Sequence, residues 1–141
     1  MFYTNEKLGC NIIIIMLYTL TNLVRYLSTV KIKGKIMDYV EDVKKYASNV
    51  SEAAVAGVVK HCGIALRSKD ASMVSCSQKP ELATVRNSFL KKKLALTDSE
   101  ADLDKAIDAV CEKMGTSNRN KSRVTFYYLL AEKYGKLSLF E

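Results

Sequence analysis

Residues 97–115 read TDSEADLDKAIDAVCEKMG, and this stretch predicts the clearest helix of the chain. Thr97 and Glu100 have the spacing of a capping box, in which two side chains satisfy N–H groups at a helix start. Acidic residues also gather in the first turn, where the helix dipole favours negative charge. Apolar residues then recur at helical spacing until Gly115, a typical helix end; they are Leu103, Ala106, Ile107, Val110, Cys111 and Met114.

Similar signals predict further helices on both sides of this one. They are expected over residues 38–47, 51–63, 77–93 and 119–134. Ser51 and Ser77 are suitable N-caps, Gly63 is a suitable helix end, and a short helical turn is expected through Met73 and Val74. Residues 37–141 show no alternating strand pattern of useful length. We therefore predict one all-α domain over residues 37–141, a compact orthogonal or irregular bundle of about five helices.

Composition narrows the classes of function. The chain has 141 residues, a net charge of +7, one proline and one histidine. A single histidine excludes His-rich metal sites and argues against a Ser-His-Asp enzyme. No Gly-rich phosphate loop, zinc-protease motif or nucleophile elbow occurs. We therefore expect a protein that is not an enzyme and that needs no cofactor.

The four cysteines, Cys10, Cys62, Cys76 and Cys111, form no C-x-x-C pair. Because no convincing signal peptide precedes them, we interpret them as reduced thiols in a cytoplasmic protein. Their spacing, together with that of His61, matches no zinc pattern, so no metal site is predicted. Cys76 precedes an expected helix start, which makes it a candidate reactive thiol; the alternative is a small buried residue at a turn.

The first 36 residues differ from the rest of the chain. Leu8–Val24 is an uncharged stretch of 17 residues, at the lower limit of length for a membrane span. Residues 29–36 alternate apolar and basic side chains, which fits either a short edge strand or sequence upstream of the true start. Residues 1–36 are thus a hydrophobic N-terminal extension with three interpretations: a start-site artefact ending before Met37, a weak membrane anchor or a docked helix. If residues 8–24 do span a membrane, the basic residues after them keep the domain on the cytoplasmic side of an inner membrane.

Basic residues supply two candidate binding sites. Arg119, Lys121 and Arg123 crowd the expected start of the last helix, where free N–H groups and cations together would bind an anion or phosphate. The alternative is that they pair with the acidic residues of 98–112. Lys91, Lys92 and Lys93 form a candidate basic patch for nucleic acid, with a solvated helix end as the alternative.

The last predicted helix is apolar on two faces. One face carries Val124, Tyr127, Tyr128, Ala131 and Tyr134, and the other carries Phe126, Leu129 and Leu130. Such a helix is either central in the fold or shared with a partner chain. We take Phe126, Tyr128, Leu129 and Leu130 as candidate interface residues of a homodimer.

Four stretches look familiar as a set: YVEDVKKY (39–46), VKHCGIAL (59–66), SFLKKKL (88–94) and RVTFYYLLAEK (123–133). Together they resemble a family of short bacterial proteins, the domain of unknown function numbered two-eight-five-three. The resemblance covers residues 37–141 and none of 1–36. It implies a small, all-helical, cytoplasmic bacterial protein and supplies no activity, substrate or catalytic residue. Members of that family typically begin near the position of Met37, which favours the start-site interpretation.

Three functions follow as hypotheses. The first is a non-enzymatic module that self-associates, as a homodimer, or binds an unknown protein partner. The second is a nucleic-acid or phosphate binder that uses the basic residues above, and its affinity would fall steeply with salt. The third is a cytoplasmic domain tethered to a membrane through residues 8–24.

Overall fold

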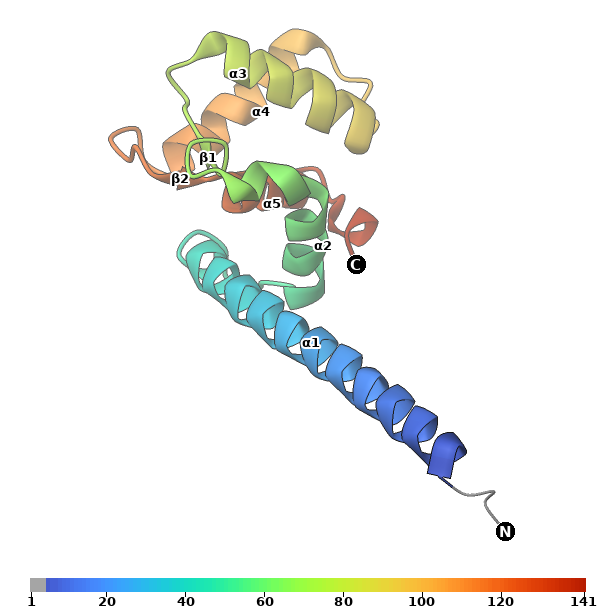
Figure 1. Ribbon diagram of the computed structural model, residues 1–141. Coiled ribbons are helices and arrows are strands. Elements are labelled where there is room, and N and C mark those ends of the chain that lie inside the picture. Colours follow the sequence, from blue (N-terminus) through green and yellow to red (C-terminus); the bar gives the residue numbers. More distant parts are fainter. Residues whose placement is uncertain (1–4) are drawn as a thin grey trace. The chain divides into compact units, whose positions relative to one another are not determined.

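The structure is a computed structural model that describes residues 5–141, with side chains from Ile12 onward (Figure 1). Its contacts divide the chain into two units, residues up to Lys35 and residues Ile36–Glu141. The long helix α1, Asn5–Lys44, contributes to both units. Of the two alternatives for residues 29–36, the edge strand is therefore wrong, because these residues are helical. All side chains described between residues 12 and 35 are exposed, whereas Val40 and Val43 belong to the core of the second unit.

The second unit confirms the all-helical fold expected from sequence. Helix α2, Glu52–Cys62, begins at the predicted N-cap, where Ser51 Oγ accepts a hydrogen bond from the N–H of Ala54. It ends at Gly63, whose φ of +39° is more accessible to glycine than to other residues. A short 3₁₀ helix, η1 (Gly63–Arg67), follows.

Helix α3, Lys79–Thr84, continues directly into the π-helix η2, Val85–Lys93. Gln78, and not Ser77, occupies the N-cap position, and Pro80 lies in the first turn as predicted. Val85 and Phe89 face the core as expected, and Leu90 joins them. The last turn of η2 is basic, which suits the negative end of a helix dipole.

Helix α4, Glu100–Lys113, buries the apolar face that its sequence predicts. Its cap differs from the prediction, because Ser99 and not Thr97 accepts the hydrogen bond, from the N–H of Asp102 at 3.2 Å. Gly115 follows the helix with a φ of +95°.

A small antiparallel pairing is the main departure from the predicted elements. β1, Met73–Val74, pairs with β2, Lys121–Ser122, in the register Met73↔Ser122 and Val74↔Lys121. Met73 and Val74 were predicted to be helical, and the last helix was predicted to begin at residue 119. It begins instead after this pairing, as α5, Arg123–Lys133.

Helix α5 is the central element of the domain. Its residues 124–131 are all buried, and it contacts both α2 and α4 (Figure 1). The 3₁₀ helix η3, Leu137–Leu139, follows it and precedes the buried Phe140. A central position explains the two apolar faces, because each face packs against a different part of the same chain.

The candidate interface residues are therefore corrected to core residues. Phe126, Tyr128, Leu129 and Leu130 are each at most 2% exposed, so none offers surface to a second chain. The hydroxyl of Tyr128 also accepts a hydrogen bond from the N–H of Ser51 at 3.0 Å, which ties α5 to the start of α2.

Candidate functional site

Three of the residues singled out in the sequence, Cys76, Arg119 and Lys121, line one cavity of about 430 Å³. We call this cavity the disulfide pocket; its remaining lining residues are Val74, Ser75, Ser77, Thr116 and Asn118. The pairing of β1 with β2 creates it, because Val74 and Lys121 lie opposite each other and carry the flanking loops with them. One loop leads from β1 to α3 and the other leads from α4 to β2.

Cys76 is bonded to Cys111 of α4 in a disulfide, with 6.1 Å between the two Cα atoms. This corrects the prediction that both are reduced thiols, and Cys76 is not a free nucleophile in this state. Cys76 is half-buried and borders the pocket, whereas Cys111 is only 7% exposed. Of the two sulfurs, solvent and solutes therefore reach that of Cys76 more readily. Cys62 remains a buried free thiol, and burial raises its pKa to about 11.

The charge of the disulfide pocket is positive. Arg119 is exposed at its rim, and Lys121 is 3% exposed, with its ammonium donating a hydrogen bond to the carbonyl of Asn118. Two further hydrogen bonds fix the side chain of Asn118. Its amide nitrogen donates to the carbonyl of Met114, and its side-chain oxygen accepts from the N–H of Asn120. Within the described residues, no carboxylate lines this pocket and no ion pair involves either cation.

A second hollow of about 350 Å³ shares Val74, Ser75 and Arg119 with the disulfide pocket. Its other lining includes Asp70 and Glu81, so carboxylates lie on that side of Arg119 only. The two hollows therefore differ in charge, and the disulfide pocket is the one suited to an anion.

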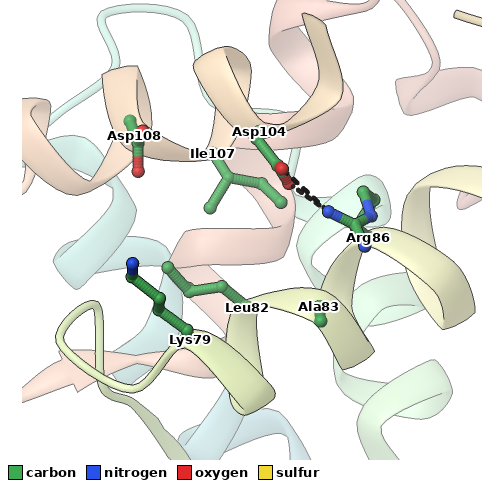
Figure 2. A pocket seen from close by; sticks show the side chains of 7 residues that line it. All are labelled: Lys79, Leu82, Ala83, Arg86, Asp104, Ile107 and Asp108. Carbon is green, nitrogen blue, oxygen red and sulfur yellow. Dashed lines mark hydrogen bonds and ion pairs between the residues drawn. The ribbon is translucent and has the colours of Figure 1, made fainter. Parts of the chain in front are cut away.

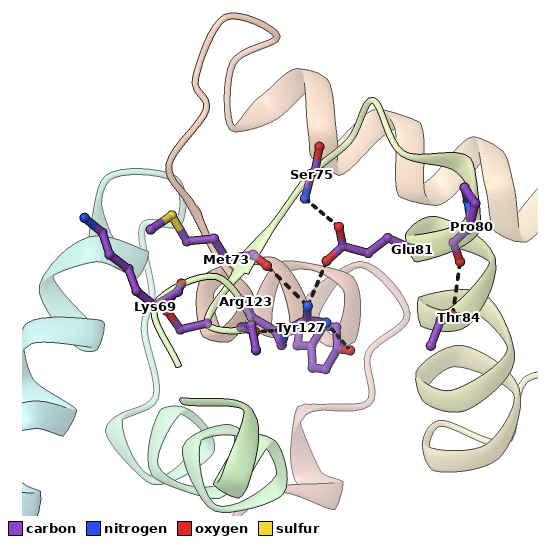
Figure 3. A network of polar contacts seen from close by, with 10 residues as sticks. Lys69, Met73, Ser75, Pro80, Glu81, Thr84, Arg123 and Tyr127 are labelled. Carbon is purple, nitrogen blue, oxygen red and sulfur yellow. Dashed lines mark hydrogen bonds and ion pairs between the residues drawn. The ribbon is translucent and has the colours of Figure 1, made fainter. Parts of the chain in front are cut away.

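Arg123, the third predicted anion ligand, lies elsewhere, in the polar network of Figure 3. Its guanidinium donates to the carbonyls of Ala71 (2.6 Å) and Met73 (3.2 Å) and to the carboxylate of Glu81 (2.8 Å). The other carboxylate oxygen of Glu81 accepts from the N–H of Ser75. The network thus fastens β1 and the following loop to α3 and α5, which is a structural role.

Titration behaviour agrees with that role. Burial would lower the pKa of Arg123, but the hydrogen bond to Tyr127 and the charge of Glu81 outweigh it and raise the pKa. Burial raises the pKa of Tyr127 despite the neighbouring Arg123. Arg123 therefore stays charged and Tyr127 stays neutral at ordinary pH.

The acidic residues of 98–112 were the alternative partners of Arg119, Lys121 and Arg123. Among the described residues, three of them pair with other cations instead; they are Glu100, Asp102 and Asp104. Figure 2 shows a hollow of about 370 Å³ between α3 and α4, where Arg86 lies beside Asp104. One guanidinium nitrogen contacts both oxygens of Asp104, at 2.7 and 2.8 Å. This carboxylate neutralises Arg86, so the hollow is a poor anion site.

The lysines of the candidate basic patch do not form one free surface. The ammonium of Lys91 donates to Glu100 at 2.6 Å, and this bond is the main reason that the pKa of Glu100 is lowered. The ammonium of Lys93 lies 5.3 Å from the ring centroid of Phe140, while Lys92 is simply exposed. Only one of the three is thus a solvated lysine without a described partner.

His61 belongs to an aromatic cluster with Phe89, Tyr127 and Phe140, at ring distances of 5.7–6.3 Å. Burial, and then the charge of Lys93, lowers its pKa. In the part of the chain that the structure describes, no group of three or more His, Cys, Asp or Glu residues could hold a metal ion. His61 itself is exposed, and one side of its ring lies against this aromatic cluster at the end of α2.

Sequence reasoning missed the hydroxyl and amide residues of the disulfide pocket. Ser75 and Ser77, whose hydroxyl oxygens lie 3.0 Å apart, flank Cys76. Thr116 and Asn118 come from the turn after α4. In the sequence these residues belong to two short polar stretches far apart from each other, and neither stretch indicates that the two lie side by side in the fold.

Comparison with known proteins agrees with the resemblance seen in the sequence. Comparison with curated proteins gives no match. A family model described as "Protein of unknown function (DUF2853)" matches residues 38–138, which covers nearly all of the second unit and none of residues 1–37. The chain therefore belongs to the DUF2853 family.

Proposed function

We propose that this protein is a small helical domain attached to the cytoplasmic face of a membrane by helix α1. The observation that carries the proposal is the exposed apolar surface of that helix. Between Ile12 and Ile32, fourteen large apolar side chains are each at least half exposed. The first seven of them are consecutive: Ile12, Ile13, Ile14, Ile15, Met16, Leu17 and Tyr18. By length and composition, α1 is long and apolar enough to cross a membrane.

The distribution of apolar residues favours lipid over a second helix as the cover. Six consecutive apolar residues at 12–17 point to every side of a helix that turns about 100° per residue. A helix that pairs with one partner needs an apolar stripe on one side only. A surface that is apolar all round is typical of a helix surrounded by lipid.

The hydroxyl side chains of α1 also suit an apolar surrounding. Thr19, Thr21, Ser28 and Thr29 each donate a hydrogen bond to a carbonyl three or four residues earlier, at 2.8–2.9 Å. These are all the serines and threonines between residues 12 and 35. Thr19 and Thr21 lie within the uncharged stretch, whereas Ser28 and Thr29 follow Arg25. Because the helix itself satisfies the hydroxyls of Thr19 and Thr21, burying them in lipid costs less than burying free ones.

Charge supports the cytoplasmic orientation. Arg25, Lys31, Lys33 and Lys35 follow the uncharged stretch, and basic residues next to a span favour the cytoplasmic side. The 17 uncharged residues span about 25 Å as a helix, slightly less than the ~30 Å of a hydrocarbon core. The long side chain of Arg25 can extend towards the headgroups and close that difference.

The test is flotation of the full-length chain with liposomes, together with alkaline washing of membranes from cells that produce it. The wild type should float and resist washing. Ile13→Lys with Leu17→Lys should remain in the soluble fraction, because each lysine costs about 2.5–3.5 kcal/mol at the centre of a span. Asn87→Lys with Ala109→Lys, at exposed positions of η2 and α4, adds the same charge and should float like the wild type.

Two outcomes would contradict the proposal. A wild-type chain that stays soluble and monomeric without detergent would show that α1 needs no apolar cover. A soluble wild type that forms a dimer, broken by the two lysines in α1, would show that a second copy covers this helix in place of lipid.

A further inference from the structure

We propose that the disulfide pocket is a thiol–disulfide exchange site for small anionic thiols, molecules that carry one thiol together with carboxylates. Such a thiol would enter beside Cys76 and reduce the bond to Cys111. The proposal goes beyond membrane attachment, and only the cellular setting considered below rests on the proposed cytoplasmic location. It rests on three features of the pocket: the position of the disulfide, the charge of the lining and the size of the cavity.

The position of the disulfide selects the sulfur that reacts. Exchange requires a thiolate to reach one of the two sulfurs. Cys76 borders the pocket and is half-buried, whereas Cys111 is nearly buried on α4 and does not line the pocket. Attack is therefore expected at the sulfur of Cys76, with the sulfur of Cys111 as the leaving group.

The charge of the lining selects an anionic thiol. Arg119 and Lys121 attract both the attacking thiolate and the carboxylates of the incoming molecule, and no carboxylate among the lining residues opposes them. The hydroxyls of Ser75, Ser77 and Thr116 add hydrogen-bond donors for those carboxylates. Once exchange has occurred, the same cations would stabilise a thiolate at Cys76.

The volume of about 430 Å³ lies within the range of pockets that hold small molecules and is far too small for a folded protein. On the cytoplasmic side of a membrane, disulfides are usually transient or redox-sensing, because cellular thiols keep cysteines reduced. A disulfide open to a cationic pocket fits that setting better than a permanent crosslink does.

The chemistry balances with thiols as the only reductant. The first thiolate forms a bond to the sulfur of Cys76 while the bond between Cys76 and Cys111 breaks, and the Cys111 thiolate takes up a proton. A second thiolate attacks the mixed disulfide, releases Cys76 as a thiolate and leaves as the symmetrical disulfide of the small molecule. Two thiols thus supply the two electrons that reduce one protein disulfide.

The experiment compares two probes that differ in charge and share a thiol: glutathione, with a net charge of −1, and its diethyl ester, with a net charge of +1. The full-length chain is held in neutral detergent micelles at low salt, so membrane attachment does not enter the result. Rate constants for loss of the Cys76–Cys111 bond are measured by quenching and peptide mass spectrometry. They are expressed per thiolate, since thiol pKa also affects the rate.

Glutathione is expected to react about tenfold faster than its diethyl ester, because its charge is two units more negative and two cations line the pocket. Arg119→Gln should reduce this ratio to about threefold, Arg119→Lys should restore it, and high salt should bring it close to one. Lys60→Gln, which removes an exposed cation that lines a different hollow, should leave the ratio unchanged. The first adduct should map to Cys76.

Equal rate constants for the two probes would overturn the proposal, as would a ratio that does not respond to Arg119→Gln. An adduct found on Cys111 would show that the sulfur facing the pocket is not the one attacked. A disulfide that neither probe reduces while the domain stays folded would make the bond a permanent crosslink. Because Arg119 is exposed, its variants should fold, and near-ultraviolet circular dichroism of the tyrosines checks this.

Discussion

Replacing Gly57 with alanine is expected to destabilise the domain, although this change usually stabilises a helix. Gly57 lies inside α2, where alanine would be favoured by about 1 kcal/mol. A Cβ atom at this position would lie 1.9 Å from the carbonyl oxygen of Phe140 and 2.7 Å from its carbonyl carbon. These are backbone atoms, so no side-chain rotation relieves the clash, and the C-terminal segment must move away from α2.

The cost of that movement has an upper limit. Phe140 is 6% exposed, and its ring packs 5.9 Å from that of Phe89. Exposing such a side chain completely costs about 1.5–3 kcal/mol, and the chain will take the cheapest rearrangement. After the gain in helix propensity is subtracted, the free energy of unfolding should fall by about 0.5–2 kcal/mol, which corresponds to a Tm lower by about 2–16 °C.

The assay is thermal unfolding of the full-length chain in micelles, followed by near-ultraviolet circular dichroism of the tyrosines, which lie mostly in the domain. The same substitution is then made in a chain that lacks Phe140 and Glu141. There the clash is gone, so Gly57→Ala should raise the Tm by about 4–8 °C. A higher Tm for Gly57→Ala in the full-length chain, or an equal decrease in both chains, would refute the reasoning.

Three further predictions concern the polar network, the disulfide and His61. Glu81→Gln leaves the buried charge of Arg123 without its carboxylate, so unfolding in urea should show a loss of about 2 kcal/mol, whereas the exposed Glu112→Gln should show none. Cys111→Ser removes the disulfide, which joins residues 35 positions apart, so the free energy of unfolding should fall by about 3–4 kcal/mol. Dithiothreitol should lower the urea midpoint of the wild type similarly and leave that of the variant unchanged. Burial lowers the pKa of His61 below 6.5, so this imidazole takes up a proton more readily in the unfolded chain than in the folded one. The Tm should therefore fall as the pH drops below 6.5, and His61→Gln should flatten that part of the plot of Tm against pH.

The helices that sequence predicted well are those whose signals are local. Helix α2 begins after Ser51 and ends at Gly63, as predicted. These signals are local because a capping hydroxyl and a residue with positive φ act within one turn of the helix. The apolar face predicted for α4 was correct for the same reason, because the spacing of its apolar residues depends on that helix alone. Even the N-cap error at α4, Ser99 in place of Thr97, is a shift between two suitable hydroxyls two residues apart.

The elements that sequence missed depend on contacts between distant residues. β1 and β2 have two residues each, too few to show an alternating pattern, and each is extended only because the other is beside it. Their pairing delays the start of α5 to Arg123 and removes Arg119 and Lys121 from the expected helix. The disulfide was missed for a related reason, because cysteine spacing alone does not determine which cysteines pair.

The candidate site brings together residues that the sequence singled out separately, for a reason that the sequence did not indicate. Arg119 and Lys121 were predicted as an anion site because they seemed to crowd a helix start, and Cys76 was predicted separately as a thiol beside another helix. The structure brings all three to one pocket through strand pairing, and no helix N-terminus is involved. Two positive charges near one another in sequence are also near one another in space, so both line this pocket. That an anion binds there stays a prediction.

The separation of Arg123 from Arg119 gives the strongest reason to assign the pocket a role outside folding. The guanidinium of Arg123 is used to join the carbonyls of β1 to Glu81 and Tyr127, so its donors hold the domain together. Arg119 makes no ion pair with any described residue, yet it lies at the rim of a cavity that is also lined by the half-buried Cys76 of the disulfide. A cation that the fold does not use, placed next to a bond that anionic thiols can break, is better explained by an incoming anion than by stability.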